Sequence, residues 1–448
     1  MSEAVGEDHA SLDAASAGGG IVAVAIGLGV YGVATYAFLG LAGRSLGPEL
    51  FAPLSVLWSV LNGVGIGLFV PFEQELSRRT AERRARGLGN APVVRESLVA
   101  AAVVLAGVVL VASASGWLLA GHLYGGRGDL VVVTVLALAG MALSYVVRGL
   151  LSGNGRFTSY GAQFVVDGVL RVAGAAVLAA AGVTSVFAFG MVLVVAPVLA
   201  VVVTTPRAPG ALVQAGPPHS RRSTATAFAA LIAASLLAQV IANAGPVIVE
   251  VVGTRAEAAA AGQFLAALVV ARVPLFVFAA VQAVLLPGLA RTVSAGSAVA
   301  FRRQFALVAT VTGGIGVLGV VAIWAVGTTV VPMLFSDAFG VERGVITLIA
   351  ASGAAQMLAQ AVAQALLALG ADRAVVVGWA VGLVSLLAAT AWSGPVAERA
   401  AWALLAGGAV SLVVLGAALV GRYRAWAQPL ARAAGASAPT TEEGGNHG

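Results

Sequence analysis

Long apolar runs, separated by short polar segments, occupy most of the chain. Twelve runs are each long enough for a helix to cross a hydrocarbon layer of roughly 30 Å, which takes about 18 or more residues. They lie at residues 14–43, 50–72, 97–126, 130–147, 158–181, 184–206, 223–249, 258–290, 304–331, 344–369, 374–391 and 400–421. The pattern predicts an all-α polytopic membrane protein with twelve transmembrane helices.

Composition supports this interpretation and excludes several other classes. Of the 448 residues, 60% are hydrophobic and 10% are charged, which leaves too little polar surface for a soluble globule. Cysteine is absent, which excludes disulfides and thiolate metal sites. The formal charge is +6, but no basic run is interleaved with aromatic residues, so nucleic acid is not an expected partner.

The basic residues, all of them arginine, indicate an orientation. Eighteen arginines, Arg148 among them, fall in the predicted loops and tail on the side of the N-terminus, and five fall in the opposite loops. Because cytoplasmic loops are enriched in basic residues, both termini are expected in the cytoplasm. The arginine-only usage is typical of high-GC bacterial genes, and we expect a multi-pass protein of the bacterial cytoplasmic membrane.

Polar segments divide the chain into five parts. Residues 1–18 are expected to form a disordered cytoplasmic tail, and residues 19–204 an N-terminal six-helix lobe. The proline-containing segment 205–223 is predicted to be a cytoplasmic linker, followed by a C-terminal six-helix lobe at 224–421. Residues 422–448 are predicted to be a second disordered tail.

A weak internal repeat supports the two-lobe division. The spacing Gly-x-x-Arg-x-x-x-x-Gly begins at Gly153 and again at Gly370, an offset of 217, and Pro71 pairs with Pro287 at an offset of 216. Both matches fall at equivalent positions of the two sets of six runs. The repeat predicts two pseudo-symmetric lobes in the same orientation, with the substrate between them.

A polar stripe interrupts the apolar run at 158–181. Gln163, Asp167 and Arg171 recur at a spacing of four, so they share one face of a helix. Both charges fall near the middle of the membrane, where ionised groups are costly and are usually kept for function. Two interpretations stay open: a self-satisfied Asp167–Arg171 pair that holds helices together, or the lining of a substrate cavity.

Arg272 is the second charged position inside an apolar run. No acidic residue lies within a helical turn of it, and Pro274 loosens the helix that follows. A guanidinium here is suited to bind a diphosphate through paired hydrogen bonds. The alternative is a structural pair with Asp167 or Glu250 on another helix.

Amide side chains form further stripes. Asn243 follows Gln239 by four residues, and Gln360 lies midway between Gln356 and Gln364 at the same spacing. These stripes are consistent either with a wet interior surface or with ordinary hydrogen bonding between helices, worth about 0.6 kcal/mol per contact in membranes.

Catalytic chemistry is not indicated. The four histidines lie in tails and loops, and neither an HExxH motif nor a phosphate-binding Gly-rich loop occurs. The chain is therefore not expected to be an enzyme or to bind a cofactor or metal, and transport would draw on a gradient or on the membrane potential.

Three segments resemble the polysaccharide-transporter branch of the multidrug/oligosaccharidyl-lipid/polysaccharide (MOP) exporter superfamily. They are Ala42 to Phe51 (AGRSLGPELF), the turn GNGRF at 153–157 with Asp167 and Arg171, and Ala271 to Pro274 (ARVP) continuing to Pro287. The resemblance implies a V of two six-helix lobes, like that of MATE transporters, around a central cationic cavity. It further implies alternating access and a polyprenyl-diphosphate-linked glycan as the substrate, with Arg44 among the cavity residues.

Other functions remain as alternatives. The efflux branch usually carries a cation-site acid in the first or seventh helix, but here 14–43 has none and Glu250 lies near the end of its run. The peptidoglycan-precursor flippases usually have two further helices. Cation-coupled multidrug efflux is therefore the second candidate, and a membrane scaffold for glycan synthesis the third. Expected partners are the lipid bilayer, the lipid-linked glycan, a coupling cation and glycan-synthesis proteins.

Overall fold

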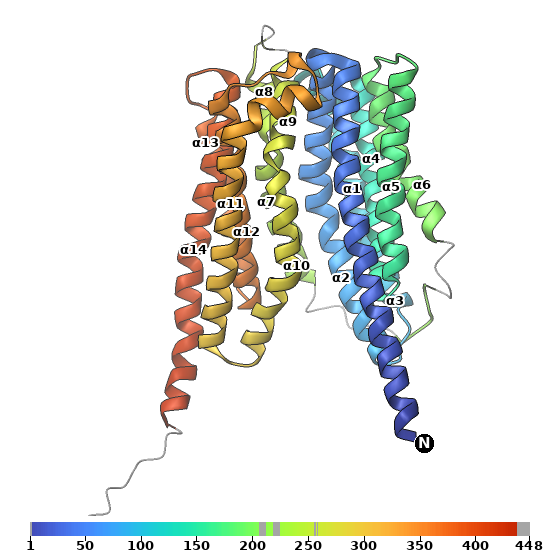
Figure 1. Ribbon diagram of the computed structural model, residues 1–448, viewed down its shortest axis with the longest axis vertical. Helices are drawn as coiled ribbons and strands as arrows, with labels where there is room; N and C mark the ends of the chain where they lie inside the picture. Colours follow the sequence, from blue (N-terminus) through green and yellow to red (C-terminus); the bar gives the residue numbers. More distant parts are fainter. Residues whose placement is uncertain (1, 206–211, 218–224, 255–256, 258, 437–448) are drawn as a thin grey trace, which may run out of the picture.

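The computed structural model describes residues 2–205, 212–217, 225–254, 257 and 259–436, and its regular elements are all helical (Figure 1). The first half contains α1 (Ser2–Val60), the π-helical turn η1 (Leu61–Gly65), α2 (Ile66–Ala85), α3 (Ala91–Leu123), α4 (Gly128–Gly153), α5 (Phe157–Ala180) and α6 (Val186–Thr204). The second contains α7 (Ala225–Asn243), α8 (Gly245–Val252), α9 (Ala260–Ala271), α10 (Val273–Ser294), α11 (Ala298–Leu334), the short η4 (Asp337–Phe339), α12 (Arg343–Ala368), α13 (Asp372–Ala389) and α14 (Val396–Ala436).

The helices account for every predicted apolar run. Nine helices of the described chain are long and apolar enough to cross a membrane, and α7 with α8 forms a tenth candidate bent by 61°. One of the nine is the 64-residue segment Val22–Ala85, far longer than the roughly 20 residues of a single crossing. Helices α9 and α10 together cover the run predicted at 258–290. The predicted all-α polytopic fold is confirmed.

The 64-residue segment is divided at Gly47. This glycine has φ 71° and ψ 167°, which is outside the helical region, and Pro48 follows it. A proline disfavours the helical conformation of the residue before it, and only glycine adopts such a positive φ at little cost. The chain therefore turns back at Gly47, and the two arms of this segment account for the runs predicted at 14–43 and 50–72.

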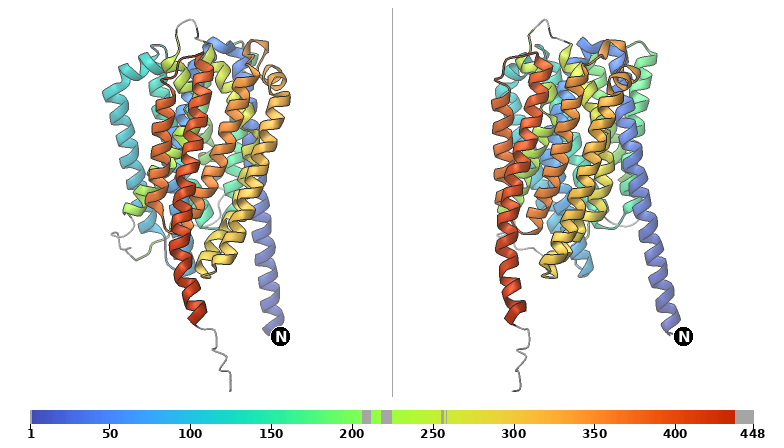
Figure 2. Two further views of the ribbon diagram at one scale, coloured as in Figure 1. Left: turned by 90° about the vertical axis from the view of Figure 1, so that its left-hand side faces the viewer. Right: turned by 60° about the vertical axis from the view of Figure 1, so that its left-hand side comes forward.

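The two halves lie side by side, with α1 to α6 on one side and α7 to α14 on the other (Figure 1). The start of α1 and the end of α14 lie at the same end of the molecule in all views (Figure 2). We call this the termini end, and the opposite end, where α1 turns, the Gly47 end.

The turns at Gly155 and Gly370 share one geometry. These glycines have φ of 72° and 67°, and each ends a helix that is followed immediately by another. The N–H of Arg156 donates to Leu151 and that of Ala371 donates to Leu366. The same bond also crosses the turns at Gly182 and Gly296, so it is a common glycine helix ending, and the internal repeat stays a prediction.

The polar segments are more ordered than predicted. Residues 2–18 belong to α1 instead of a disordered tail. Residues 422–436 likewise continue α14, in a stretch rich in Ala and Arg. Within the predicted linker, residues 206–211 and 218–223 lie outside the described residues, as do tail residues 437–448.

The halves meet closely at the Gly47 end. A Cβ at Gly262 of α9 would lie 2.5 Å from the carbonyl oxygen of Pro48, so only a glycine fits between α9 and the turn. The ring of Phe51 packs edge-on against Phe335 and Phe339, with centroids 5.9 and 5.6 Å apart. The structure is therefore closed between the halves at this end.

Inside the first half, α1 and α5 cross at a glycine pair. A Cβ at Gly161 would lie 2.4 Å from the carbonyl oxygen of Ala23, and one at Gly27 would lie 2.4 Å from the carbonyl of Gly161. Membrane helices lack a hydrophobic drive to associate, so such close backbone packing contributes much of their stability.

We expect Gly161→Val to lower the free energy of unfolding by about 1–3 kcal/mol, because the added side chain forces the two backbones apart. Gly107→Val is the matched control, since nothing lies within 4 Å of a Cβ at Gly107. Thermal unfolding of the purified proteins in detergent measures both. Equal melting temperatures for the two variants would contradict the close crossing.

Candidate functional site

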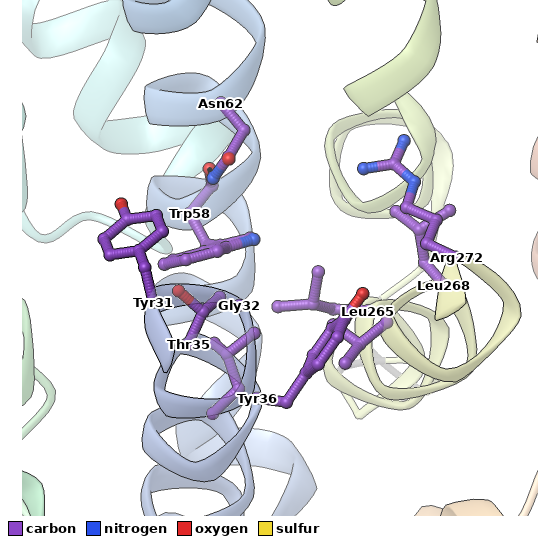
Figure 3. A pocket seen from close by; sticks show the side chains of 11 residues that line it. Tyr31, Gly32, Thr35, Tyr36, Trp58, Asn62, Leu265, Leu268 and Arg272 are labelled. Atoms are coloured by element: carbon purple, nitrogen blue, oxygen red, sulfur yellow. Dashed lines mark hydrogen bonds between the residues drawn. The ribbon is translucent and has the colours of Figure 1, made fainter. Parts of the chain in front are cut away.

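A cavity lies between the two halves. Its volume is about 190 Å³, and residues of α1, η1 and α9 line it together with Arg272 (Figure 3). The lining residues are Tyr31, Gly32, Thr35, Tyr36, Leu39, Trp58, Asn62, Leu265, Leu268, Val269 and Arg272. We call it the central cavity. It has the mainly apolar wall with a few polar groups that is typical of ligand sites.

Two proline-induced helix breaks set the position of Arg272. Pro274 has no N–H and interrupts the helix, so Arg272 falls at the junction of α9 and α10. Pro246 similarly leaves the carbonyl of Ala242 without its helical donor, at the bend between α7 and α8. The Arg272 guanidinium donates from Nη2 to this carbonyl and from Nη1 to Oδ1 of Asn243, at 2.7 Å for the latter.

Arg272 has only neutral partners. None of the ion pairs among the described residues includes it, and neither of the two expected partners, Asp167 and Glu250, is within reach. A guanidinium has five N–H donors, and the two bonds to Ala242 and Asn243 leave three of them. Arg272 is thus a cation at the wall of the central cavity that no carboxylate neutralises.

The stripe on α5 lies elsewhere. Gln163, Asp167 and Arg171 are 0%, 1% and 7% exposed, and none of them lines the central cavity. Arg171 donates from Nε and Nη2 to the two carboxylate oxygens of Asp167, at 2.8 and 3.2 Å. The prediction that these residues face the space between the halves is wrong, because α5 turns this face towards α1 and α4.

Arg148 completes this group. It was expected in a loop, but it lies inside α4, 5% exposed, with Nη2 at 3.5 Å from Oδ2 of Asp167 and its guanidinium 4.0 Å from the ring centre of Phe164. One carboxylate therefore serves two guanidinium groups. We call Asp167, Arg171 and Arg148 the Asp167 cluster.

Tyr31 lies between the cluster and the central cavity. The Arg171 guanidinium lies 5.0 Å from the ring centre of Tyr31, and Tyr31 also lines the cavity (Figure 3). Gln163 has no hydrogen-bond partner among the described residues, although both of its amide atoms are buried. The cluster can therefore influence the cavity only through Tyr31 or through a rearrangement.

The remaining predicted site residues are dispersed. Arg44 lies at the Gly47 end and donates to the carbonyls of Met333 and Leu334, which end α11 and lack helical donors. It belongs to the closure between the halves rather than to the central cavity. Asn243 does not line the central cavity but accepts a hydrogen bond from Arg272. Gln360 is partly buried and does not line the central cavity either.

Several cavity residues were missed from the sequence. Tyr31, Tyr36 and Trp58 carry no distinctive spacing in an apolar run, and aromatic residues in such runs are usually packing residues. Asn62 was missed as well: its Nδ2 donates to the carbonyl of Trp58 at 2.8 Å, and the residue also lines the cavity. The signal that could have identified them is their position opposite Arg272 in a two-lobe arrangement.

Known proteins resemble the chain at two levels. No model of a known protein family matches it. It is 28% identical over 391 residues to an uncharacterized protein of Mycobacterium tuberculosis, covering 84% of this chain and 86% of that protein. An uncharacterized protein of Mycobacterium bovis matches to the same extent.

Solved structures give the fold. An inward-facing conformation of a multidrug resistance MATE family transporter of the MOP superfamily aligns with a TM-score of 0.64 and 15% identity, over 92% of this chain and 99% of that one. A eukaryotic MATE transporter aligns with a TM-score of 0.66 and 13% identity, over 93% and 97%. The protein is a multi-pass membrane protein. Its fold is that of the MATE transporters of the MOP superfamily.

We expect Asp167→Asn to destabilise the protein by about 3–5 kcal/mol, because it removes the ion-pair partner of two buried guanidinium groups. Asp129→Asn is the comparison, because Asp129 and Arg127 form an ion pair whose two side chains are 37% and 34% exposed. Its loss should cost below about 1 kcal/mol. Melting temperatures of the purified variants provide the comparison. A melting temperature of Asp167→Asn as high as that of Asp129→Asn would rule out a structural role for the Asp167 cluster.

Proposed function

We propose that the protein exports a polyprenyl-diphosphate-linked glycan across the bacterial cytoplasmic membrane by alternating access. The observation that carries this proposal is Arg272, which presents free N–H donors at the wall of the central cavity and has no acidic partner among the described residues. An uncompensated cation inside the membrane is costly, so such a residue is retained where an anion binds.

A diphosphate matches the chemistry of this wall. The planar guanidinium can donate two parallel hydrogen bonds to phosphate oxygens, which an ammonium cannot reproduce. The lining residues of the central cavity include no Asp or Glu that would repel an anion. At about 190 Å³, the cavity in this closed arrangement suits the diphosphate and the groups next to it rather than an entire glycan.

Alternating access follows from where the halves meet. In the structure they are closed at the Gly47 end by Phe51, Phe335, Phe339 and the bonds of Arg44. We infer that the cavity loads from the termini end, which the arginine distribution assigns to the cytoplasm, and that substrate leaves after the contacts at the Gly47 end separate. Breaking a few side-chain contacts there requires no helix to unfold.

Cation-coupled multidrug efflux is the second candidate, favoured by the fact that the similar solved structures are multidrug transporters. Coupling to a cation needs an acidic side chain that can exchange its partner. Asp167 is already bound by Arg171 and Arg148, but Glu73 of α2, which accepts a hydrogen bond from the Tyr160 hydroxyl, forms no ion pair among the described residues. Neither carboxylate lines the central cavity, whereas Arg272 does, and this favours the anionic substrate in the proposal. A scaffold for glycan synthesis would leave the cavity and its free guanidinium without a role.

We expect Arg272→Gln to abolish transport of a lipid-linked sugar in reconstituted vesicles, since it removes the charge. Arg272→Lys should retain part of the rate, since it keeps the charge but loses the planar fork. Arg343→Gln is the control, because Arg343 lies at the exposed start of α12.

A purely structural role of Arg272 would give a different result. Its bonds to Ala242 and Asn243 would be lost in both Arg272 variants, so melting temperature and transport rate would fall together. Transport lost at a near-normal melting temperature supports substrate binding, whereas wild-type transport by Arg272→Gln would eliminate Arg272 as a ligand.

A further inference from the structure

A second cavity, of about 380 Å³, lies at the termini end of the first half, where α2 ends, α3 begins and α4 passes into α5 (Figure 1). Its volume is in the range of small-molecule sites, about 300–1,000 Å³. The polar residues that line it are Thr80, Arg84, Asn90, Asn154, Arg156 and Gln214. We call it the linker pocket, because Gln214 belongs to the segment that joins the two halves.

The linker pocket is cationic. Arg84 and Arg156 both line it, and none of its lining residues is acidic. Arg84 uses one nitrogen, Nη1, to donate to the carbonyl of Asn154 at 2.7 Å, which fixes the guanidinium at the pocket. Arg156 donates no hydrogen bond to any side chain or carbonyl in the described part of the chain, so its guanidinium remains available to an anion.

Helix starts add to the positive potential. Asn90 and Arg156, which line the pocket, are the residues just before α3 and α5, and neither uses its side chain to cap the helix that follows. The first N–H groups of a helix are unsatisfied, and its N-terminus carries about half a positive charge. At α3 the N–H of Ala91 already donates to the carbonyl of Gln214 and Pro92 has no N–H, so it is the start of α5 that offers its first N–H groups to a phosphate.

Thr80 provides independent support for a ligand. Its side chain lines the pocket and is 1% exposed, yet its hydroxyl has no hydrogen-bond partner among the described residues. Leaving a buried hydroxyl unpaired costs about 1–3 kcal/mol. A bound anion that accepts a hydrogen bond from this hydroxyl would recover that cost.

The walls of the pocket are held in place by hydrogen bonds from α2 and the start of α3. The Asn90 side chain donates to the carbonyl of Leu212 and accepts from the N–H of Gln214, each at 2.9 Å. Arg83 donates to the carbonyl of Pro217 at 2.7 Å. These hydrogen bonds hold residues 212–217 against the first half, and Gln214 forms one side of the pocket.

We propose that the linker pocket is a binding site for a phosphate-bearing anion, separate from the central cavity. The phosphate group lies between Arg84 and Arg156, accepts a hydrogen bond from the Thr80 hydroxyl, and faces the start of α5. The group belongs either to the headgroup of an anionic lipid or to a soluble phosphate. Because Gln214 forms one wall, the bound anion also strengthens the attachment of the linking segment to the first half.

The test is the melting temperature of the purified full-length protein in detergent, titrated with two probes. One probe is phosphatidic acid, with phosphatidylcholine of the same acyl chains as its control. The other is inorganic phosphate, with sodium chloride at equal ionic strength as its control for screening. A ligand that binds only the folded protein raises the melting temperature in proportion to its occupancy.

Three variants locate the site. In the double variant Arg84→Gln/Arg156→Gln, we expect the apparent dissociation constant to rise about tenfold or more, since bonds to charged groups contribute about 1.5–3 kcal/mol each. Arg86→Gln removes a charge from the same loop, on an exposed residue that does not line the pocket, and should bind as the wild type does. Thr80→Val should melt no lower than wild type without ligand, since it removes an unpaired hydroxyl, but should bind the probe more weakly.

The outcomes distinguish a lipid headgroup from a soluble phosphate, and both of these from the absence of a binding site. Stabilisation by phosphatidic acid alone identifies a lipid headgroup, and stabilisation by inorganic phosphate as well identifies a soluble phosphate. No stabilisation by either probe would overturn the proposal. Equal weakening by Arg86→Gln and by the double variant would also overturn it, because binding would then reflect the general charge of the surface. None of these outcomes depends on transport through the central cavity.

Discussion

A guanidinium inside a hydrocarbon layer must find hydrogen-bond acceptors, and this constraint organises the interior of the protein. The cost of leaving it unpaired amounts to several kcal/mol, so each buried arginine determines where nearby helices bend and cross. Arg171 and Arg148 both donate to one carboxylate, that of Asp167, which lies between α1, α4 and α5. Arg272 donates to a backbone carbonyl and to a side-chain amide oxygen, and both of these acceptors are neutral.

The different partners give the two kinds of site different roles. A carboxylate shared by two arginines is a closed arrangement that fixes three helices and leaves little capacity for an external ion. An arginine bound only to neutral acceptors keeps its charge and part of its hydrogen-bonding capacity for a visiting anion. Helix breaks make the second arrangement possible, because Pro246 frees the Ala242 carbonyl and Pro274 places Arg272 at a junction. Arg44, which is exposed at the Gly47 end, also donates to backbone carbonyls, those that end α11.

The sequence predicted the features that depend on local pattern. Apolar length identified the runs that the helices occupy. The isolation of Arg272 from any acid within a turn predicted a cation without an acidic neighbour, and in the structure its hydrogen bonds go to neutral acceptors. Periodicity also grouped Gln163, Asp167 and Arg171 on one face of α5, but a helical face does not reveal its neighbour, and this one faces α1 and α4. Arg148 was missed because it lies near the end of α4, where an arginine is indistinguishable from a loop anchor. The linker pocket escaped notice because its residues come from α2, the turn after it, the turn between α4 and α5, and Gln214, which are far apart in the sequence.

The absence of cysteine from the chain allows a direct test of the central claim, that the central cavity binds an anionic lipid diphosphate through Arg272. Thr35 lines this cavity and is close in size to cysteine, so Thr35→Cys places one reactive thiol there. The measurement is the rate at which a small maleimide modifies this thiol, with and without polyprenyl diphosphate. We expect the lipid to slow modification in the Thr35→Cys protein but not when Arg272→Gln is added. Equal protection with and without Arg272, or no protection in either protein, would contradict the account.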